Sequence, residues 1–189
     1  VVLAAIKQSR RYMPLALLWI AVYLSAGYVQ HQRAVTMGEE LALSRGHTVL
    51  RLEAKPSFGN LAVWKVVYET EGRFYIDAVK PGVGGTKIWE GENVAKLNIG
   101  RDLPWLDITS QQARDIERFR KSSGGYLAVD PRHPLLVGDI RYSLLPQEVA
   151  PLWGIELRPD AASSEHVRFY TRRENAGAAL RRILAMIFE

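Results

Sequence analysis

A run of apolar residues without any charged side chain covers residues 14–29, PLALLWIAVYLSAGYV. A helix needs about 20 mostly apolar residues to cross the hydrocarbon core of a bilayer, and the residues on either side extend this run to that length. Tyr12 and Trp19 lie towards one end and Tyr28 at the other, as is typical of side chains at two membrane interfaces. The pattern predicts a membrane-spanning helix, with a buried core helix as the alternative.

The pattern changes after residue 33, where charged and apolar side chains begin to mix. Helical spacing continues over residues 33–45, and Gly46 is a typical helix end. We therefore expect a membrane anchor over residues 1–33 and a soluble domain over residues 34–189.

Period-two alternation predicts β-strands in the first half of the soluble domain. Residues 47–55 alternate in this way, as in a half-buried strand. Residues 61–70 and 73–80 are rich in β-branched and aromatic side chains and are separated by two turn residues, so we expect a hairpin. A short strand is expected over residues 87–89, and further strands over residues 126–129, 136–144 and 153–157.

Two helices are expected in the second half of the domain. Thr109 followed by Gln112 has the spacing of a capping box and predicts a helix start. Residues 174–188 carry an apolar stripe at helical spacing, which consists of Leu180, Ile183, Leu184 and Ile187. Together, the elements predict an α+β fold, in which a mostly antiparallel sheet is accompanied by a few helices.

Charge and composition exclude only a few classes of partner and site. The net charge is +5 and the pI is near 9.6, but no block of Lys and Arg dominates, so nucleic acid is not an expected partner. The same charge would favour an anionic bilayer surface. The absence of cysteine excludes disulfides and thiolate metal ligands.

The basic residues before the predicted span indicate an orientation. Residues 7–11, KQSRR, form a short basic segment, and short loops rich in Lys and Arg stay in the cytoplasm. We therefore expect the soluble domain to lie outside the cytoplasm. Residues 1–6, VVLAAI, are apolar, and we interpret them as the end of an earlier membrane helix of the same protein.

The densest polar constellation is GDIRY, residues 138–142. On a continuous strand, Asp139 and Arg141 would point to one side and Tyr142 to the other. Asp139 and Arg141 could form a recognition pair for a polar or anionic group. The alternative is a structural ion pair at the end of a strand.

A second candidate set lies on the helix that follows Thr109. Arg114 and Asp115 are its binding candidates, and the alternative is a solvated helix face. No catalytic residue can be identified, because the serines lack a G-x-S-x-G motif. The four histidines are scattered without metal-ligand spacing, so no metal ligand is assigned, although His133 has Asp130 nearby.

Three stretches together resemble a known family. They are residues 55–79 (KPSFGNLAVWKVVYETEGRFYIDAV), residues 104–129 and, most specifically, residues 138–157 (GDIRYSLLPQEVAPLWGIEL). They are similar to the C-terminal part of the YdjM/YbcI-like membrane-bound metal-dependent hydrolases of bacteria. The resemblance covers roughly residues 46–172.

This resemblance implies a bacterial inner-membrane protein with several spans and a divalent metal in the full-length form. The family's metal-binding segments lie in its N-terminal membrane half, and nothing in this chain matches them. The expected function is therefore the last span and the soluble, accessory or substrate-facing domain of such a hydrolase. Its expected partners are the lipid bilayer and upstream membrane helices. The alternative is a non-catalytic module that binds an envelope or lipid component.

Overall fold

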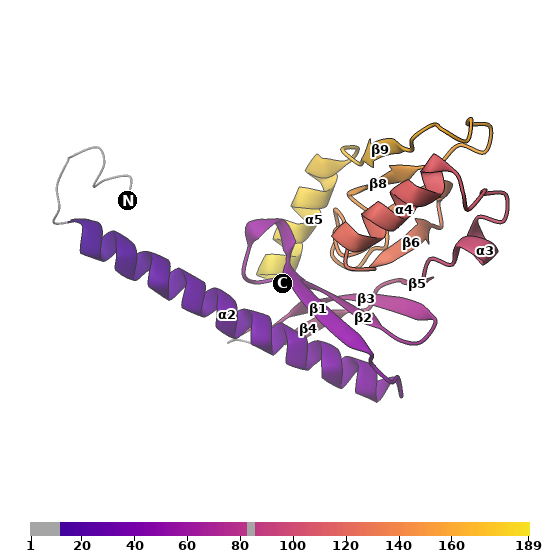
Figure 1. The fold of residues 1–189 in the computed structure, drawn as a ribbon. Coiled ribbons are helices and arrows are strands. Elements are labelled where there is room, and N and C mark those ends of the chain that lie inside the picture. Colours follow the sequence, from indigo (N-terminus) through magenta and orange to yellow (C-terminus); the bar gives the residue numbers. More distant parts are fainter. Residues whose placement is uncertain (1–11, 83–85) are drawn as a thin grey trace.

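The computed structural model describes residues 12–82 and 86–189 of the chain (Figure 1). The apolar and basic segments over residues 1–6 and 7–11 lie outside the described residues. The first element is α2 (Met13–Ser44), a single helix of 32 residues. Among the described residues, α2 is the one helix long and apolar enough to cross a membrane, by length and composition. The apolar 18-residue stretch of α2 is 0% buried inside the molecule, whereas the core helix of a soluble protein is mostly buried.

The C-terminal part of α2 packs on a sheet. Ala34, Met37 and Ala42 are buried, and Met37 belongs to a core cluster with Trp64 and Val66. The expected boundary between residues 33 and 34 therefore falls inside one continuous helix. Arg45 caps this helix, and Gly46 follows in a left-handed conformation with φ +70°, so the predicted helix end is confirmed.

The first sheet follows α2 and is antiparallel throughout. Its strands are β1 (Arg51–Pro56), β2 (Trp64–Glu69), β3 (Arg73–Lys80), β4 (Lys87–Trp89) and β5 (Asn93–Ala95). They are ordered β1-β2-β3-β4, and β5 also pairs with β3. The short 3-10 helix η2 (Ser57–Gly59) lies between β1 and β2. The expected hairpin is confirmed as β2–β3.

The second sheet has the order β6-β7-β8-β9 and is also antiparallel. Its strands are β6 (Leu127–Asp130), β7 (His133–Asp139), β8 (Trp153–Glu156) and β9 (Arg168–Thr171). The short helix α3 (Ile99–Asp102) and the longer α4 (Gln111–Ser122) precede it. One face of this sheet packs on α4, and the other contributes Tyr126, Ala128 and Ile140 to a core shared with the first sheet. The α+β prediction is confirmed.

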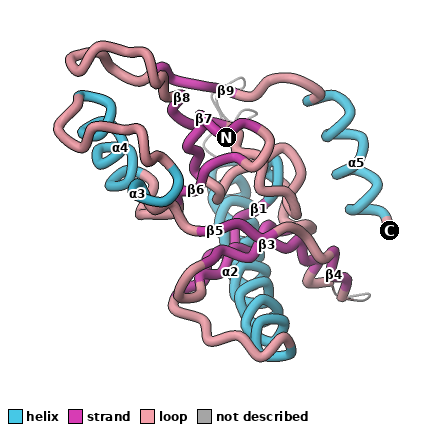
Figure 2. Tube along the Cα trace, turned by 90° about the vertical axis from the view of Figure 1, so that its right-hand side faces the viewer, coloured by secondary structure: helices cyan, strands magenta, loops and turns pink. Residues whose placement is uncertain are grey.

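The C-terminal helix α5 (Ala176–Phe188) lies at the side of both sheets, away from α4 (Figures 1 and 2). Ala179, Ile183 and Met186 are buried on it. Of the predicted apolar stripe, Ile183 is buried, whereas Leu180 and Leu184 are 47% and 45% exposed. The stripe is therefore only partly packed against the rest of the molecule.

Other expectations differ from the structure in detail. The N-cap of α4 is Ser110, whose hydroxyl accepts a hydrogen bond from the Ala113 N–H, and Thr109 instead donates to Asp107. The strand expected over residues 136–144 begins at His133 and ends at Asp139. Strands β5 and β9 and helix α3 were not predicted, since each has only three or four residues.

Candidate functional site

Asp139 and Arg141 form a close ion pair where β7 ends. The Asp139 carboxylate accepts hydrogen bonds from the Arg141 backbone N–H at 3.1 Å, from Nε at 2.9 Å and from Nη2 at 2.6 Å. The expected alternation of a continuous strand over residues 138–142 is wrong, because the chain turns after Asp139 and Arg141 folds back on it. Asp139 is 2% exposed, so this is a buried pair.

This ion pair belongs to a cluster that joins the two sheets. The guanidinium of Arg51, from β1, lies 3.9 Å from the ring centre of Tyr126, and that of Arg141 lies 5.5 Å from it. Arg51 also forms an ion pair with Glu69 and donates to the Gly124 carbonyl. Burial raises the pKa of Tyr126 to about 12. The charges in this cluster largely compensate one another, as expected of a structural role.

Tyr142 lies next to this cluster and lines a cavity. Its ring packs against that of Trp153 with ring centres 4.5 Å apart and the planes tilted by 33°, and the Lys55 ammonium lies 5.4 Å from its ring centre. The cavity has a volume of about 130 Å³ and lies between the end of β1, η2, the start of β2 and the segment after β7. We call it the lysine pocket; its polar lining is Lys55, Ser57, Lys65, Arg141, Tyr142 and Ser143.

Lys65 is the most unusual side chain of the lysine pocket. It is 4% exposed and lies on β2, every residue of which is buried. Its ammonium donates to the Ser143 hydroxyl and to the Glu148 carbonyl, both at 2.7 Å. Desolvation lowers the pKa of Lys65 to about 7, against the attraction of Glu148, Glu92 and Asp139. Sequence reasoning missed this residue, although a lysine inside an otherwise apolar strand pattern is a visible signal.

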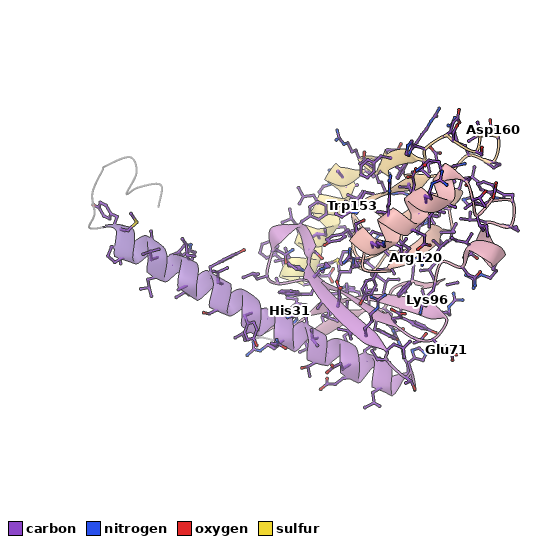
Figure 3. The ribbon with its side chains drawn as sticks, viewed as in Figure 1. His31, Glu71, Lys96, Arg120, Trp153 and Asp160 are labelled. Atoms are coloured by element: carbon purple, nitrogen blue, oxygen red, sulfur yellow. The ribbon has the colours of Figure 1, made fainter. Side chains whose placement is uncertain are left out.

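The lysine pocket lies close to the membrane end of the domain. Gln30, on α2 just after the apolar run, donates to the carbonyls of Leu61 and Pro81 at 3.3 and 2.7 Å. The next residue, His31, meets Trp64 edge to face at 5.7 Å, where α2 joins the domain (Figure 3). Leu61 and Trp64 flank the turn between η2 and β2. Trp64 packs on α2, and the neighbouring Lys65 leaves β2 on the opposite face, so the pocket lies across the sheet from α2 and beside this turn.

Arg114 and Asp115 lie on α4 and do not join this site. Asp115 accepts hydrogen bonds from Gln111 and the Val167 backbone and contacts His166 at 2.8 Å. Arg114 donates to Gln111 and to the Thr109 carbonyl. Asp115 therefore fastens the segment before β9 to α4, and neither residue shares a partner with Asp139 or Arg141 in the part of the chain that the structure describes.

The histidines do not assemble into a metal centre. Across residues 12–82 and 86–189, no three or more His, Asp or Glu side chains lie close enough together to hold an ion. His133 approaches Glu156 at 3.6 Å, while neighbouring Asp130 binds Arg172 at 2.8 Å. The described residues therefore do not fit a divalent metal.

Comparison of the chain with protein-family models, with curated proteins and with solved structures gave no match. The similarity to the membrane-bound hydrolases therefore stays a prediction from the sequence. The fold adds one relevant fact. Lys55, Ser57 and Phe58 belong to the first resembling stretch, Tyr142 and Ser143 belong to the last, and both stretches meet at the lysine pocket.

Proposed function

We propose that the chain is the last span and soluble domain of a bacterial inner-membrane metal-dependent hydrolase, in which this domain positions substrate and does not supply the metal. The observation that carries this proposal is the meeting of residues 55–58 and 141–152 around one cavity. These segments come from two of the three stretches that resemble that family, and the second lies in the most specific of them. Because the two segments line one cavity, they can contact the same ligand. The neighbouring charged side chains, in contrast, already form ion pairs with one another.

The position of the pocket fits a substrate at the bilayer surface. With a rise of 1.5 Å per residue, the helix from Met13 to Gln30 is roughly 26 Å long, close to the hydrocarbon thickness. Gln30 would then lie at the interface, and its hydrogen bonds fix the Leu61 turn beside it. The remainder of α2 packs on β1, β2 and β3, so the domain cannot swing freely about the helix.

The metal content of purified protein tests this assignment. We would measure bound transition metals in this chain and in the complete protein from the same gene, both purified in one detergent. We expect stoichiometric metal in the complete protein and less than a tenth of that in this chain. Stoichiometric metal in this chain, or none in the complete protein, would contradict the proposal.

We also propose that the soluble domain lies outside the cytoplasm, from the basic residues over 7–11. The chain has no cysteine, so a single reporter thiol can be placed without background. Asp160 is exposed on a loop far from α2 (Figure 3). We expect Asp160→Cys to react with a membrane-impermeant maleimide in spheroplasts. Labelling only after lysis would place the domain in the cytoplasm.

A second candidate function, an envelope- or lipid-binding module, is favoured by the exposed face of α5. Leu180 and Leu184 are about half exposed and Phe188 is 85% exposed, with Arg181 and Arg182 beside them. Lys80, next to the Pro81 that binds Gln30, donates to the Ile187 carbonyl at 2.7 Å. The C-terminal end of α5 therefore lies near the membrane end of the domain, where apolar and basic side chains suit an interfacial helix.

The accessibility of spin labels on the full chain in nanodiscs distinguishes this second candidate function from the hydrolase proposal. We would compare Leu184→Cys on α5 with Ile108→Cys, which is 78% exposed on the loop before α4. An α5 that lies in the interface would make the label at 184 accessible to a lipid-soluble relaxation agent and the label at 108 accessible to an aqueous one. Equal aqueous accessibility at both positions would contradict membrane contact by α5.

A further inference from the structure

The charges of the lysine pocket are unevenly compensated. Lys55 forms an ion pair with Glu53 at 3.0 Å, and Arg141 forms one with Asp139 at 2.6 Å. Within the described residues, no carboxylate oxygen lies within 4.0 Å of the Lys65 ammonium. The most deeply buried cation of the pocket is thus the one without an ionic partner.

Strand pairing places two lysines on the same side of the sheet. Lys55 on β1 is the register partner of Lys65 on β2, so their side chains leave the sheet on one face. Like charges directly opposite each other destabilise an antiparallel pair. An anion between them would turn this repulsion into attraction.

The Lys65 ammonium has more N–H groups than it has acceptors among the described residues. An ammonium carries three N–H groups. Ser143 and the Glu148 carbonyl accept two of them in the described part of the chain, and both acceptors are neutral. Because Lys65 lines the cavity, its third N–H can reach a ligand there.

The shape of the cavity limits the size of that ligand. The cavity offers about 130 Å³ of water-accessible space and is open on one side. This is enough for one oxyanion inside the cavity, with the rest of a larger ligand outside it. Phe58, Pro146 and Leu152 form an apolar wall, and Phe58 is 51% exposed at the rim.

We propose that the lysine pocket binds a phosphate group, held by the Lys65 ammonium with help from Lys55 and the hydroxyl of Ser57. The Ser143 hydroxyl accepts from Lys65 and donates to the Leu145 carbonyl, so it holds the ammonium in place. The inference deepens the proposed function, on which it rests, by naming phosphate as the chemistry that this domain positions. An anionic lipid headgroup and a free phosphate compound share this chemistry. The exposed Phe58 at the rim, and the turn that directly follows η2 and binds Gln30 through the Leu61 carbonyl, fit a headgroup whose acyl chains stay in the bilayer.

Binding of inorganic phosphate to the full chain in detergent is the first test. We would titrate the protein calorimetrically in phosphate-free buffer at pH 6.5. Lys65→Met should weaken phosphate binding at least tenfold, and Lys55→Gln should weaken it about threefold to tenfold. Lys121→Met, an exposed lysine on α4, should leave it unchanged. Wild-type binding that is absent, or that survives both pocket substitutions, would overturn the proposal.

Nanodiscs distinguish the two sources of phosphate. We would place the chain in discs of phosphatidylcholine with or without phosphatidic acid and repeat the phosphate titration. If phosphatidic acid weakens the binding of inorganic phosphate to wild-type protein, the natural ligand is a lipid headgroup. If the affinity for inorganic phosphate is unchanged, the natural ligand is a soluble phosphate compound. Both outcomes support a phosphate site. This readout is independent of metal content, so the pocket and the hydrolase assignment can fail separately. If Lys65→Met does not fold, Ser57→Ala with Lys55→Gln replaces it, with an expected loss of at least tenfold.

Discussion

Lys55 and Lys65 lie directly opposite each other on two antiparallel strands and line the same cavity. Glu53 compensates Lys55, whereas Lys65 is held by a hydroxyl and a carbonyl only. Burying a charge without a charged partner costs free energy. Lys65 therefore works against the stability of the domain, and its natural counter-charge is expected to come from a ligand.

The stability of the chain should rise with pH between about 7 and 10 because of Lys65. Its folded pKa is about 7 and its ordinary value is 10.5, so between these values the unfolded chain binds a proton that the folded chain lacks. Stability then increases with pH, by at most about 1.4 kcal/mol per pH unit. Urea unfolding of wild type and Lys65→Met at pH 7, 8 and 9 in one detergent measures this difference.

The surroundings of Lys65 act on its charge in both directions. Glu148, Glu92 and Asp139 favour its ammonium, and desolvation by burial opposes it, with Lys55 and Arg141 lining the same pocket. Lys121→Met serves as the control and should follow wild type at every pH. A stability difference between wild type and Lys65→Met that stays constant from pH 7 to 9 would contradict the expected titration.

Removal of the charge of Asp139 should strongly destabilise the domain. Asp139→Asn leaves Arg141, whose side chain is 15% exposed, without its main counter-charge. Breaking a buried ion pair on one side typically costs about 3–5 kcal/mol. Glu117→Gln on α4 breaks an exposed pair with Arg120 and should cost less than about 1 kcal/mol. Equal losses in denaturant unfolding would show that the Asp139–Arg141 pair does not hold the two sheets together.

The elements with strong local signals could be predicted from the sequence. The hairpin β2–β3 follows from β-branched residues on both sides of a two-residue turn. The buried side of α4 follows from Ala113 and Ile116, and its end follows from glycines that adopt φ +59° and +80° at residues 124 and 125. In each case neighbouring residues alone decide the conformation.

Tertiary contacts decided what the sequence did not predict. Alternation past Asp139 looks like a strand, but a buried hydrogen-bonded turn with Arg141 is formed instead. Lys65 stands out in an apolar strand of the sequence, but the pocket itself could not be predicted, because it is made by the register with Lys55 and by the distant Ser143. Of the candidate residues, Arg141 and Tyr142 line this pocket, Asp139 supports it, and Arg114 and Asp115 lie elsewhere.

Gly38 should be intolerant of even one methyl group. An added Cβ would lie 2.6 Å from Val66 and 2.9 Å from Leu52, where α2 packs on the first sheet. Alanine is favoured over glycine in helices by about 1 kcal/mol, yet here Gly38→Ala should lower stability by about 1–3 kcal/mol. Gly177→Ala on α5, where an added Cβ would meet only the Arg181 guanidinium at 3.9 Å, should be neutral or stabilising. Greater stability of Gly38→Ala in detergent would show that α2 can move away from the sheet.

Asp115 should contribute stability that is lost in acid. Burial raises the pKa of its carboxyl, but hydrogen bonds from Gln111, His166 and Val167 outweigh it and hold that pKa below the ordinary 3.8. Below pH 3.8 the unfolded chain therefore binds the proton first, and stability falls as pH drops towards the folded pKa. Wild type should exceed Asp115→Asn in stability at pH 6, and the gap should narrow from pH 4 to pH 2. The control Asp160→Asn, on an exposed loop, should have the same stability as wild type at every pH. If the stability difference between wild type and Asp115→Asn does not change with pH, the charge of Asp115 is not what fastens the segment before β9 to α4.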